Sequence, residues 1–348
     1  MSKILIVGNS KAVVEKVVEI RNADQESTIA FFSTEGALPY DRNQLPYYLA
    51  KDIKESALFA VHDKFFAEHK VEVIAGEKLA RISVKRKHLT TESKRQISYD
   101  QLILIDTGIY KLPELKGVHK RGVLHALSLN SVKELMKSLM DVETVVIPVT
   151  NVQGLNIACA LARHEKDVVI LAPQGLLGAL IDDETASLLK QILEAKGIRI
   201  IDQELEEILG DQEVKAIRLK SGKVMAAQAV VLDVAAIDIH MLSEQELQQG
   251  DVRIEEEIFK PITLPLMPTR FGVGIVDGFF QGITALPEGG REYLKFDGPI
   301  NVFKKIFVQG DRLLGAVVFN APNHVTRLSQ AIESGESVTG REEALLEA

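Results

Sequence analysis

Cysteine, tryptophan and long apolar runs are absent or nearly absent from this chain. Its 348 residues include a single cysteine, Cys159, so neither an internal disulfide nor a Cys-x-x-Cys centre can form. This cysteine usage favours a reducing compartment, and we expect a cytoplasmic protein. No apolar run approaches the roughly 20 residues that a transmembrane helix needs. The formal net charge of −8 argues against nucleic acid as a partner.

Groupings of metal ligands and nucleophiles are absent too. The eight histidines show no spacing to cysteine or carboxylates that is typical of a metal site. Cys159 falls on an apolar helical face, which favours a core position over a nucleophile. The sequence therefore predicts no metal centre, and spacing alone identifies no catalytic residue.

Glycines are missing from two loops that otherwise have the context of a nucleotide site. Residues 3–7 predict an apolar strand that runs through a tight turn into a helix, and the same order begins again at Thr144. In a dinucleotide-binding loop, glycines allow the tight turn, the approach of backbone to the phosphates and close packing of helix on strand. The missing glycines therefore bear directly on whether a nucleotide binds.

The two loops keep different glycines. The first keeps only its leading glycine, Gly8, and Ser10 stands where the second glycine would be. Ser10 also suits the N-cap of the following helix, and both roles can hold at once. The second loop keeps only the last glycine, Gly154, while Val149 and Asn151 replace the first two. Because β-branched Val149 disfavours positive φ and side chains here occupy phosphate space, we interpret Asn151 and Gly154 as parts of a degenerate dinucleotide-binding loop.

The spacing of apolar residues predicts an α/β fold. Residues 3–7, 10–21 and 28–33 predict a strand, a helix and a strand, which together form a parallel βαβ unit. The same layout recurs over residues 144–171, while residues 71–105 predict hairpin strands. The chain thus contains a duplication at the scale of a domain.

Four stretches carry a resemblance to a known family. They are EGALPYDR at residues 35–42, QLPYYL at 44–49, YDQLILIDTG at 99–108 and RLLGAV at 312–317. In this order they resemble the FAD/NAD(P)-dependent pyridine nucleotide-disulfide oxidoreductases. The resemblance is closest to the branch of NADH–rubredoxin reductases, nitrite reductase large subunits and CoA-disulfide reductases. The joint order is specific, although no one stretch would be.

The resemblance implies two Rossmann-like FAD/NAD(P)-binding-type domains of three-layer ββα form and a small C-terminal α+β domain. The implied boundaries are a split FAD-type domain of residues 1–110 and 231–295, an NAD(P)-type domain of residues 111–230, and a C-terminal domain of residues 296–348. In working members of the family, a nicotinamide hydride passes to FAD and the electrons then pass to a protein or disulfide acceptor.

The resemblance also assigns candidate contacts to FAD, if FAD is retained. They are Gly8, Ser10, Glu35, Arg42, Thr107, Gly108 and Asp277. Glu35 would hold ribose hydroxyls, Arg42 would lie near the flavin or its phosphates, and residues 107–108 would form a turn next to the flavin. Asn43 stands where disulfide-reducing members have a redox cysteine, and an amide excludes thiolate chemistry there.

Several positions depart from the family pattern. Ile275 stands where an acid would grip the ribityl chain, with Asp277 as a nearby substitute. Residues 281–290 are short and turn-rich where the family has a long helix against the flavin, and Ala172 replaces a ribose-binding acid at the second loop. From these losses we expect that FAD is possible but weakly supported and that NAD(P) is unlikely.

Three functions are compatible with this pattern. The first is a non-catalytic member that acts as a subunit or adaptor of a larger, possibly redox, assembly, because contacts are lost at several separate places. The second is a working FAD-dependent oxidoreductase that exchanges electrons with a protein partner. The third is a regulatory protein that binds an adenine nucleotide. Whether the chain is an enzyme stays open, but we expect another protein subunit as partner, in a homo- or hetero-oligomer.

Overall fold

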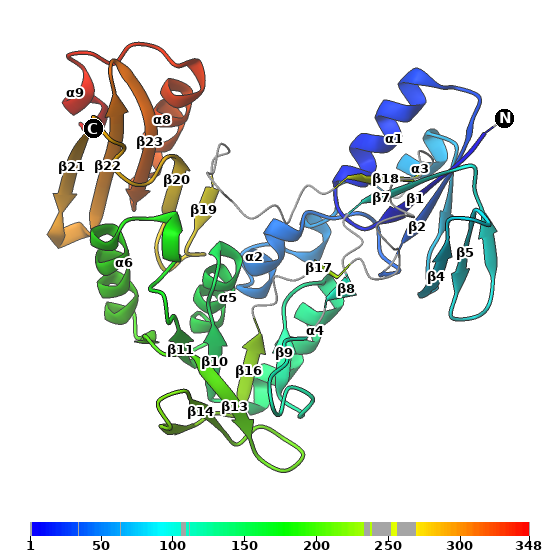
Figure 1. Ribbon diagram of the computed structural model, residues 1–348, viewed down its shortest axis with the longest axis horizontal. Helices are drawn as coiled ribbons and strands as arrows, with labels where there is room; N and C mark the ends of the chain where they lie inside the picture. The colour runs from blue at the N-terminus through cyan, green and yellow to red at the C-terminus, as the bar shows by residue number, and fades with distance from the viewer. Residues whose placement is uncertain are drawn as a thin grey trace. The chain divides into compact units, whose positions relative to one another are not determined.

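The computed structural model describes most of the chain. The described residues are 2–33, 35–62, 64–105, 109–110, 112–232, 237–238, 252–255 and 269–347. Backbone contacts divide the chain into two compact units, and Figure 1 labels many of their helices and strands. Unit 1 comprises residues 1–113, 127–133 and 234–261, and unit 2 comprises residues 114–126, 134–233 and 262–348.

A five-stranded parallel sheet forms the centre of unit 1, with strand order β18-β7-β1-β2-β3. Its strands are β1 (Lys3–Gly8), β2 (Thr28–Ser33), β3 (Val71–Ile74), β7 (Gln101–Ile105) and β18 (Val252–Glu255). β1, β2 and β7 are buried along nearly their whole length. This burial on both faces explains why their sequences are almost continuously apolar.

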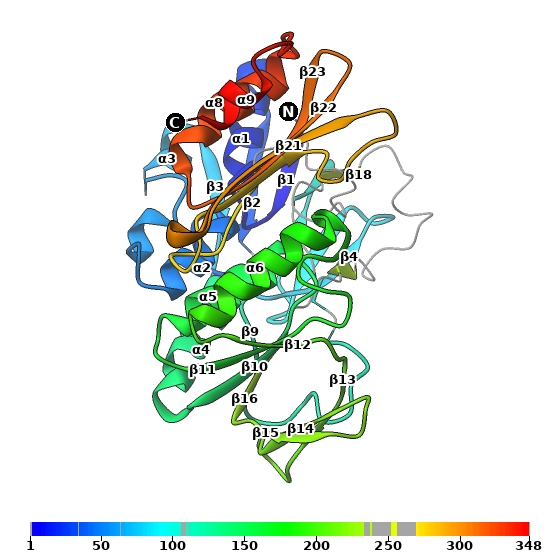
Figure 2. The ribbon, with the colours of Figure 1, turned by 90° about the vertical axis from the view of Figure 1, so that its left-hand side faces the viewer.

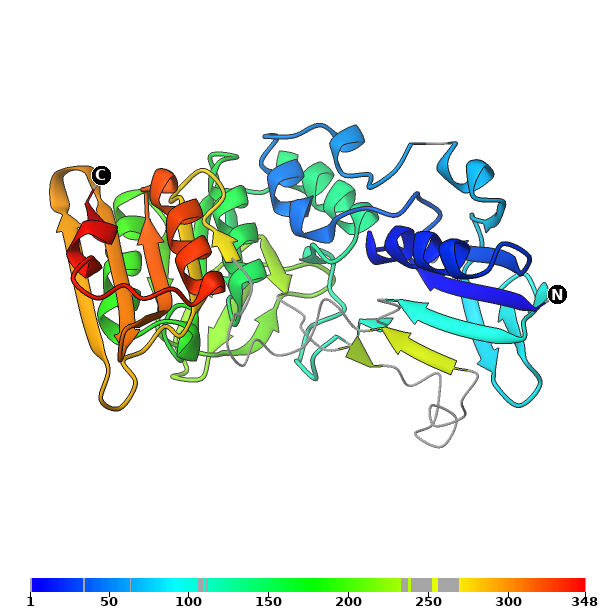
Figure 3. The ribbon, with the colours of Figure 1, turned by 90° about the horizontal axis from the view of Figure 1, so that it is seen from above.

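A helix covers one face of this sheet and a β-meander covers the other. Helix α1 (Ala12–Ala23) packs in one apolar cluster with alternate residues of β1 and β2, and Figure 3 shows it lying along the sheet. The meander consists of β4 (Leu79–Ser83), β5 (His88–Thr91) and β6 (Gln96–Ser98), paired antiparallel. It packs on the opposite face. The predicted three-layer ββα form is confirmed for this unit.

Unit 2 repeats the arrangement around a second parallel sheet of order β12-β11-β10-β16-β9. Its strands are β9 (Val123–His125), β10 (Thr144–Pro148), β11 (Asp167–Leu171), β12 (Arg199–Ile201) and β16 (Ala229–Leu232). Helix α5 (Val152–Ala162) packs against β10 and β11, and helix α6 (Asp183–Ala195), which Figure 2 shows above the strands, packs against β12. Unit 2 also contains a separate antiparallel sheet, which consists of β13 (Leu205–Leu209), β14 (Ala216–Leu219) and β15 (Val224–Ala226). The predicted domain-scale duplication is confirmed.

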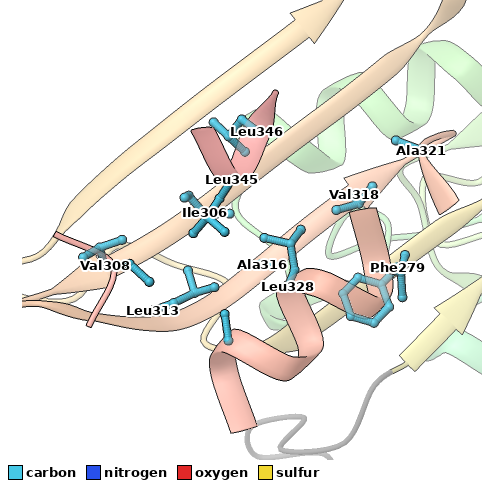
Figure 4. Packing of buried hydrophobic residues seen from close by; sticks show 13 residues of the cluster. Phe279, Ile306, Val308, Leu313, Ala316, Val318, Ala321, Leu328, Leu345 and Leu346 are labelled. Atoms are coloured by element: carbon cyan, nitrogen blue, oxygen red, sulfur yellow. The ribbon is translucent and has the colours of Figure 1, made fainter. Parts of the chain in front are cut away.

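The C-terminal part of unit 2 is an antiparallel sheet with helices on one face. Its order is β19-β20-β23-β22-β21, and its strands are β19 (Thr269–Phe271), β20 (Gly278–Gly282), β21 (Arg291–Asp297), β22 (Val302–Gln309) and β23 (Arg312–Phe319). Helices α8 (Pro322–Ser334) and α9 (Glu342–Leu346) cover it. Figure 4 shows Leu328 of α8 and Leu345 of α9 packed among Ile306 and Ala316 of the sheet. This is the small α+β domain that the resemblance implied.

The start of this sheet differs from the implied domain boundary. The boundary between residues 295 and 296 falls inside β21, and residues 269–282, expected in the FAD-type domain, supply β19 and β20 of this sheet. The reason is that β20 pairs with β23 along its whole length, and Phe279 belongs to the core beneath α8.

Short elements connect these layers. They are η1 (Arg42–Gln44), α2 (Leu45–Leu49), η2 (Glu55–Ala57), α3 (Phe65–Glu68), β8 (Ile109–Tyr110) paired with β17 (Ile237–Asp238), α4 (Leu129–Ser138), η3 (Leu139–Asp141), η4 (Gly178–Leu180) and η5 (Gly298–Ile300). Within the described ranges, no helix combines the length and apolar character that crossing a bilayer would take.

Candidate functional site

The carboxyl ends of three parallel strands meet at one edge of the unit 1 sheet. Gly8 ends β1 and lies opposite Ser33 of β2 on one side and Ile105 of β7 on the other. A Cβ on Gly8 would lie 1.9 Å from the Ile105 carbonyl oxygen, so only glycine fits at this place. In open α/β sheets, ligands bind in the crevice outside this edge.

Asn9 joins the ends of β1 and β2 through its side chain. Its Oδ1 accepts hydrogen bonds from the Ser33 hydroxyl and the Glu35 N–H, both at 3.1 Å. Its Nδ2 donates to the Ala37 carbonyl at 3.2 Å. Asn9 is completely buried, and these bonds satisfy an amide that would otherwise be costly to bury. Asn9 therefore fixes the turn from which Glu35 projects, a role that the sequence analysis missed.

The hydroxyl of Ser10 is buried and has no hydrogen-bond partner among the described residues. The prediction that Ser10 caps the helix is wrong, because the N-cap position of α1 is Lys11, whose side chain makes no capping bond. A buried hydroxyl without a partner costs about 1–3 kcal/mol. Helix N-termini attract anions, so this hydroxyl at the start of α1 fits a phosphate as its missing partner.

Glu35 is held by two side chains from the segment that follows it. Its Oε2 accepts from the Tyr40 hydroxyl at 2.7 Å and its Oε1 from the Arg42 guanidinium at 2.8 Å. Tyr40 is completely buried, and its oxygen accepts the N–H of Leu129 at 3.0 Å. Burial, reinforced by the Glu35 carboxylate, raises the pKa of Tyr40, so its phenol stays a neutral donor.

This cluster leaves the Glu35 carboxylate able to accept further hydrogen bonds. Each oxygen takes one hydrogen bond from Tyr40 or Arg42, and a carboxylate oxygen accepts two. A diol such as ribose could therefore add to the pair without breaking it. The Glu35 carboxylate as acceptor and the Ser10 hydroxyl as donor together fit the ribose and phosphate of an adenine nucleotide.

Tyr40 is the second residue that the sequence analysis did not single out. It stood inside the stretch 35–42 that carried the family resemblance, which was the signal for it. Its contact with Leu129 spans 89 positions of the chain, so no local pattern could reveal it.

Three other candidates stay predictions. Thr107 and Gly108 lie outside the described residues. Asp277 lies in unit 2, immediately before β20, where its carboxylate is 3.6 Å from Arg270 and its N–H donates to the Asn320 side chain. Between β20 and β21 the described chain has no helix, in agreement with the short turn-rich segment predicted over residues 281–290.

The second loop is built differently from the first. Asn151 is the N-cap of α5, and its Oδ1 accepts the Gly154 N–H at 2.9 Å. The Val149 N–H donates a hydrogen bond to the Leu171 carbonyl, so residue 149 extends the contact of β10 with β11. Val149 does not adopt positive φ. The loop therefore turns without the two glycines that Val149 and Asn151 replace.

Two further residues describe the surroundings of this loop. Asn156 of α5 accepts the Gly272 N–H at 2.7 Å and so links the helix to the turn after β19. Ala172, which follows β11, is buried and has no group that could accept a ribose hydroxyl. Contacts with a nucleotide here would have to come from the amino end of α5.

Other reactive groups are few in the described chain. Cys159 is completely buried in α5, and burial raises the pKa of its thiol to about 12, which confirms the expected core role. No three histidine, cysteine or acidic side chains gather as a metal would require, as far as the described residues go.

Comparison with known proteins supplies a family. A family model described as pyridine nucleotide-disulphide oxidoreductase matches residues 2–254. Over 250 residues the chain is 26% identical to rubredoxin-NAD(+) reductase of Ectopseudomonas oleovorans, covering 70% of this chain and 65% of that protein. It is 22% identical over 385 residues to nitrite reductase [NAD(P)H] of Bacillus subtilis (strain 168), covering 97% of this chain and 48% of that protein.

Among solved structures, the putidaredoxin reductase–putidaredoxin complex is similar in fold. The TM-score is 0.77 at 17% identity, with 100% of this chain and 96% of that chain covered. The chain spans between about half and two thirds of the two relatives named above, with 65% and 48% of their lengths covered.

These comparisons correct one expectation and weaken another. The expectation that NAD(P) is an unlikely cofactor is wrong, because the matching family is named for a pyridine nucleotide and the relatives are NAD(+) and NAD(P)H reductases. The interpretation of the chain as a non-catalytic member also finds no support among these redox enzymes.

Proposed function

The chain belongs to the pyridine nucleotide-disulphide oxidoreductase family, and we propose that it is a working FAD-dependent oxidoreductase that accepts electrons from NAD(P)H and exchanges them with a protein partner. The observation that carries the proposal is the cluster at the carboxyl ends of β1 and β2. There the Glu35 carboxylate can accept hydrogen bonds from a ribose and the buried Ser10 hydroxyl can donate to a phosphate, beside the close approach of Gly8 to Ile105.

Each residue of the cluster has a distinct part in this proposal. Glu35 accepts ribose hydroxyls, and Tyr40 and Arg42 hold its carboxylate in place. Ser10 donates to a phosphate oxygen, which would end the cost of burying its hydroxyl alone. Asn9 fixes the turn that carries Glu35. FAD held there would supply the redox centre, since no side chain of the protein carries electrons in this chemistry.

NAD(P)H is assigned to the β10–α5 turn of unit 2. The amino end of α5 offers backbone N–H groups and a favourable dipole to phosphate groups. At the end of β11, Ala172 carries no carboxylate, so this place does not repel the additional phosphate of NADPH. We therefore expect both NADH and NADPH to serve.

The cysteine content of the chain favours a protein redox centre over a disulfide as the electron acceptor. Disulfide exchange needs an accessible thiolate, whereas the only cysteine, Cys159, is buried with a raised pKa and Asn43 has replaced the loop cysteine. The relative named for rubredoxin supports a small redox protein as the partner class.

Anaerobic reduction of the flavin-loaded protein tests the proposal. We expect NADH or NADPH to bleach the flavin band at about 450 nm, and cytochrome c, used as a protein acceptor, to restore it. The variant Asp202→Asn, which alters only an exposed ion pair with Lys190, is the matched control and is expected to behave as the wild type. Protein that neither contains nor takes up FAD would contradict the proposal. In that case a thermal shift with ADP alone would favour a regulatory nucleotide-binding role.

A further inference from the structure

Exposed apolar side chains concentrate on one edge of the C-terminal sheet. Of the seven large apolar side chains that are exposed in the described chain, Leu294 and Phe296 lie on β21 and Ile300 follows in η5. All seven residues of β21 pair with β22, and no described strand pairs with its other edge. An open edge of this length is a template for pairing with another strand.

The apolar residues of β21 share the face that α9 does not cover. Successive side chains of a strand point to opposite faces, so Glu292, Leu294 and Phe296 lie on the same one. On the other face, Tyr293 packs against the core under α8 and α9, while Lys295 lies 3.5 Å from Glu347 near the end of α9. Helix α9 therefore does not cover the exposed side chains of Leu294 and Phe296.

The sequence of β21 is complementary to itself when read antiparallel. In such a pair, opposite residues both point their hydrogen-bonding groups at the partner strand or both away from it. A strand paired with its own copy must therefore have one residue opposite itself at the centre. With Leu294 at the centre, Arg291 lies opposite Asp297, Tyr293 opposite Lys295, and Glu292 opposite Phe296.

Neighbouring registers are unfavourable. A centre at Tyr293 would place Arg291 opposite Lys295, and a centre at Lys295 would place two lysines opposite each other. Like charges directly opposite each other destabilise a strand pair, whereas opposite charges stabilise it. Only the register centred on Leu294 keeps all seven residues of β21 paired while placing cation against anion.

We propose that β21 pairs antiparallel with β21 of a second copy of this chain, so that the two five-stranded sheets become continuous across a two-fold axis. Leu294 of each copy meets Leu294 of the other, and the Phe296 side chains flank them on the same face. Lys295, a charge of the kind that protects edge strands, faces Tyr293 of the second copy and not another cation. The proposal does not depend on the redox function.

Cysteine cross-linking is the first test. Cys159 is the only natural cysteine and is completely buried, so a single cysteine introduced by Leu294→Cys reports on position 294 alone. Directly opposite Cβ atoms lie about 4.5–5.5 Å apart in a strand pair, which is close enough for a disulfide after a small adjustment. We expect mild oxidation of the full chain to give covalent dimers of Leu294→Cys.

The matched control is Val224→Cys. Val224 is also an exposed apolar residue on an edge strand, β15, but it lies elsewhere in unit 2. It is expected to cross-link far more slowly than position 294. Equal rates at the two positions would overturn the proposal, because they would reflect random collision.

A charge exchange is the second test and needs no cross-link. Sedimentation velocity should show a wild-type dimer, while Asp297→Arg alone and Arg291→Asp alone are each monomeric because like charges face each other. Mixing the two variants should restore a dimer, since each now offers the charge that the other lacks. Thermal melts check folding, as Arg291 also lies 3.6 Å from Glu342. A monomeric wild type, or a dimer that both variants retain, would contradict the proposal.

Discussion

The two strand–turn–helix loops of this chain have the same order of elements but different side-chain chemistry. At the first, α1 begins without a side-chain cap, Ser10 buries a hydroxyl without a described partner, and Glu35 stands beyond the next strand. At the second, Asn151 caps α5 and Ala172 stands at the corresponding place. The first loop therefore offers side chains to a ligand, whereas the second offers mainly backbone.

This difference separates two effects of a missing glycine. A side chain in a phosphate loop can leave a polar group that needs a ligand, as Ser10 does, or it can satisfy the helix itself, as Asn151 does. A side chain such as Ser10 keeps ligand binding specific. A side chain such as Asn151 makes ligand binding less specific, although the helix N-terminus can still bind an anion. We expect FAD to be held more selectively than NAD(P)H.

Removal of the Glu35 carboxylate should have the largest effect on the first loop. Glu35→Ala removes one partner of the buried Arg42 guanidinium, and the loss of one member of a buried ion pair costs about 3 kcal/mol. We expect a lower melting temperature and FAD affinity reduced by more than about tenfold. Equilibrium unfolding and flavin fluorescence measure the two quantities. The control Asp202→Asn removes one partner of an exposed pair and should change neither.

Tyr40→Phe should have the next largest effect. The change removes the donor to Glu35 and leaves the Leu129 N–H without its acceptor, at a cost of about 2 kcal/mol. Tyr48→Phe is the matched control, since the Tyr48 hydroxyl makes only a long 3.4 Å bond to Glu55. If the two variants unfold at the same denaturant concentration, Tyr40 does not support the site as described.

A carboxylate placed at the second loop should make it resemble the first. Ala172→Glu is expected to weaken NADPH binding about tenfold relative to NADH, a difference of about 1.4 kcal/mol, through repulsion of the additional phosphate. Ala172→Gln controls for size, because residue 172 is buried. The ratio of the two dissociation constants, measured by fluorescence titration, should move with Glu and not with Gln.

Ser10→Ala should separate stability from binding at the first loop. Loss of a buried hydroxyl without a described partner should stabilise the flavin-free protein by about 1 kcal/mol. The same change should weaken FAD, because the phosphate loses its donor. Thermal melts without FAD measure the expected stabilisation, and melts with FAD measure the expected loss of FAD binding. A variant that is destabilised without FAD would show that the hydroxyl is satisfied within the protein.

Of these substitutions, Asn151→Gly should give the smallest change in stability. Asn151→Ala removes the α5 cap and costs about 1 kcal/mol, whereas Asn151→Gly costs only a few tenths. Because glycine also releases the Gly154 N–H, Asn151→Gly should bind NADH more tightly than the wild type. Asn151→Asp keeps the cap but adds a negative charge, so it should bind NADH more weakly. An opposite order of affinities would contradict this account of the loop.

The sequence sufficed for the local elements and failed where distant segments meet. Apolar strands followed by helical spacing predicted β1, α1 and β2 and their counterparts around β10, because such patterns depend on neighbours in the chain. The pairing of β20 with β23 joins segments with no shared periodicity, so residues 269–282 were expected in the FAD-type domain and not in the C-terminal sheet.

The site was predictable to a similar extent. Gly8 and Glu35 followed from the end of a strand and from the family resemblance, and the structure brings their segments together through Asn9. Asn9 and Tyr40 were not predictable, since the amide acts across two strand ends and the phenol contacts Leu129 far along the chain. The N-cap role of Ser10 failed because the helix begins one residue later than its sequence signal suggests.

The proposed function depends on FAD binding at the first loop. The most direct measurement is the visible absorbance spectrum of gently purified wild-type protein, with the flavin quantified after denaturation. We expect a yellow protein with a band at about 450 nm and about one FAD per chain. A colourless protein that releases no flavin, and that acquires none on incubation with FAD, would contradict it.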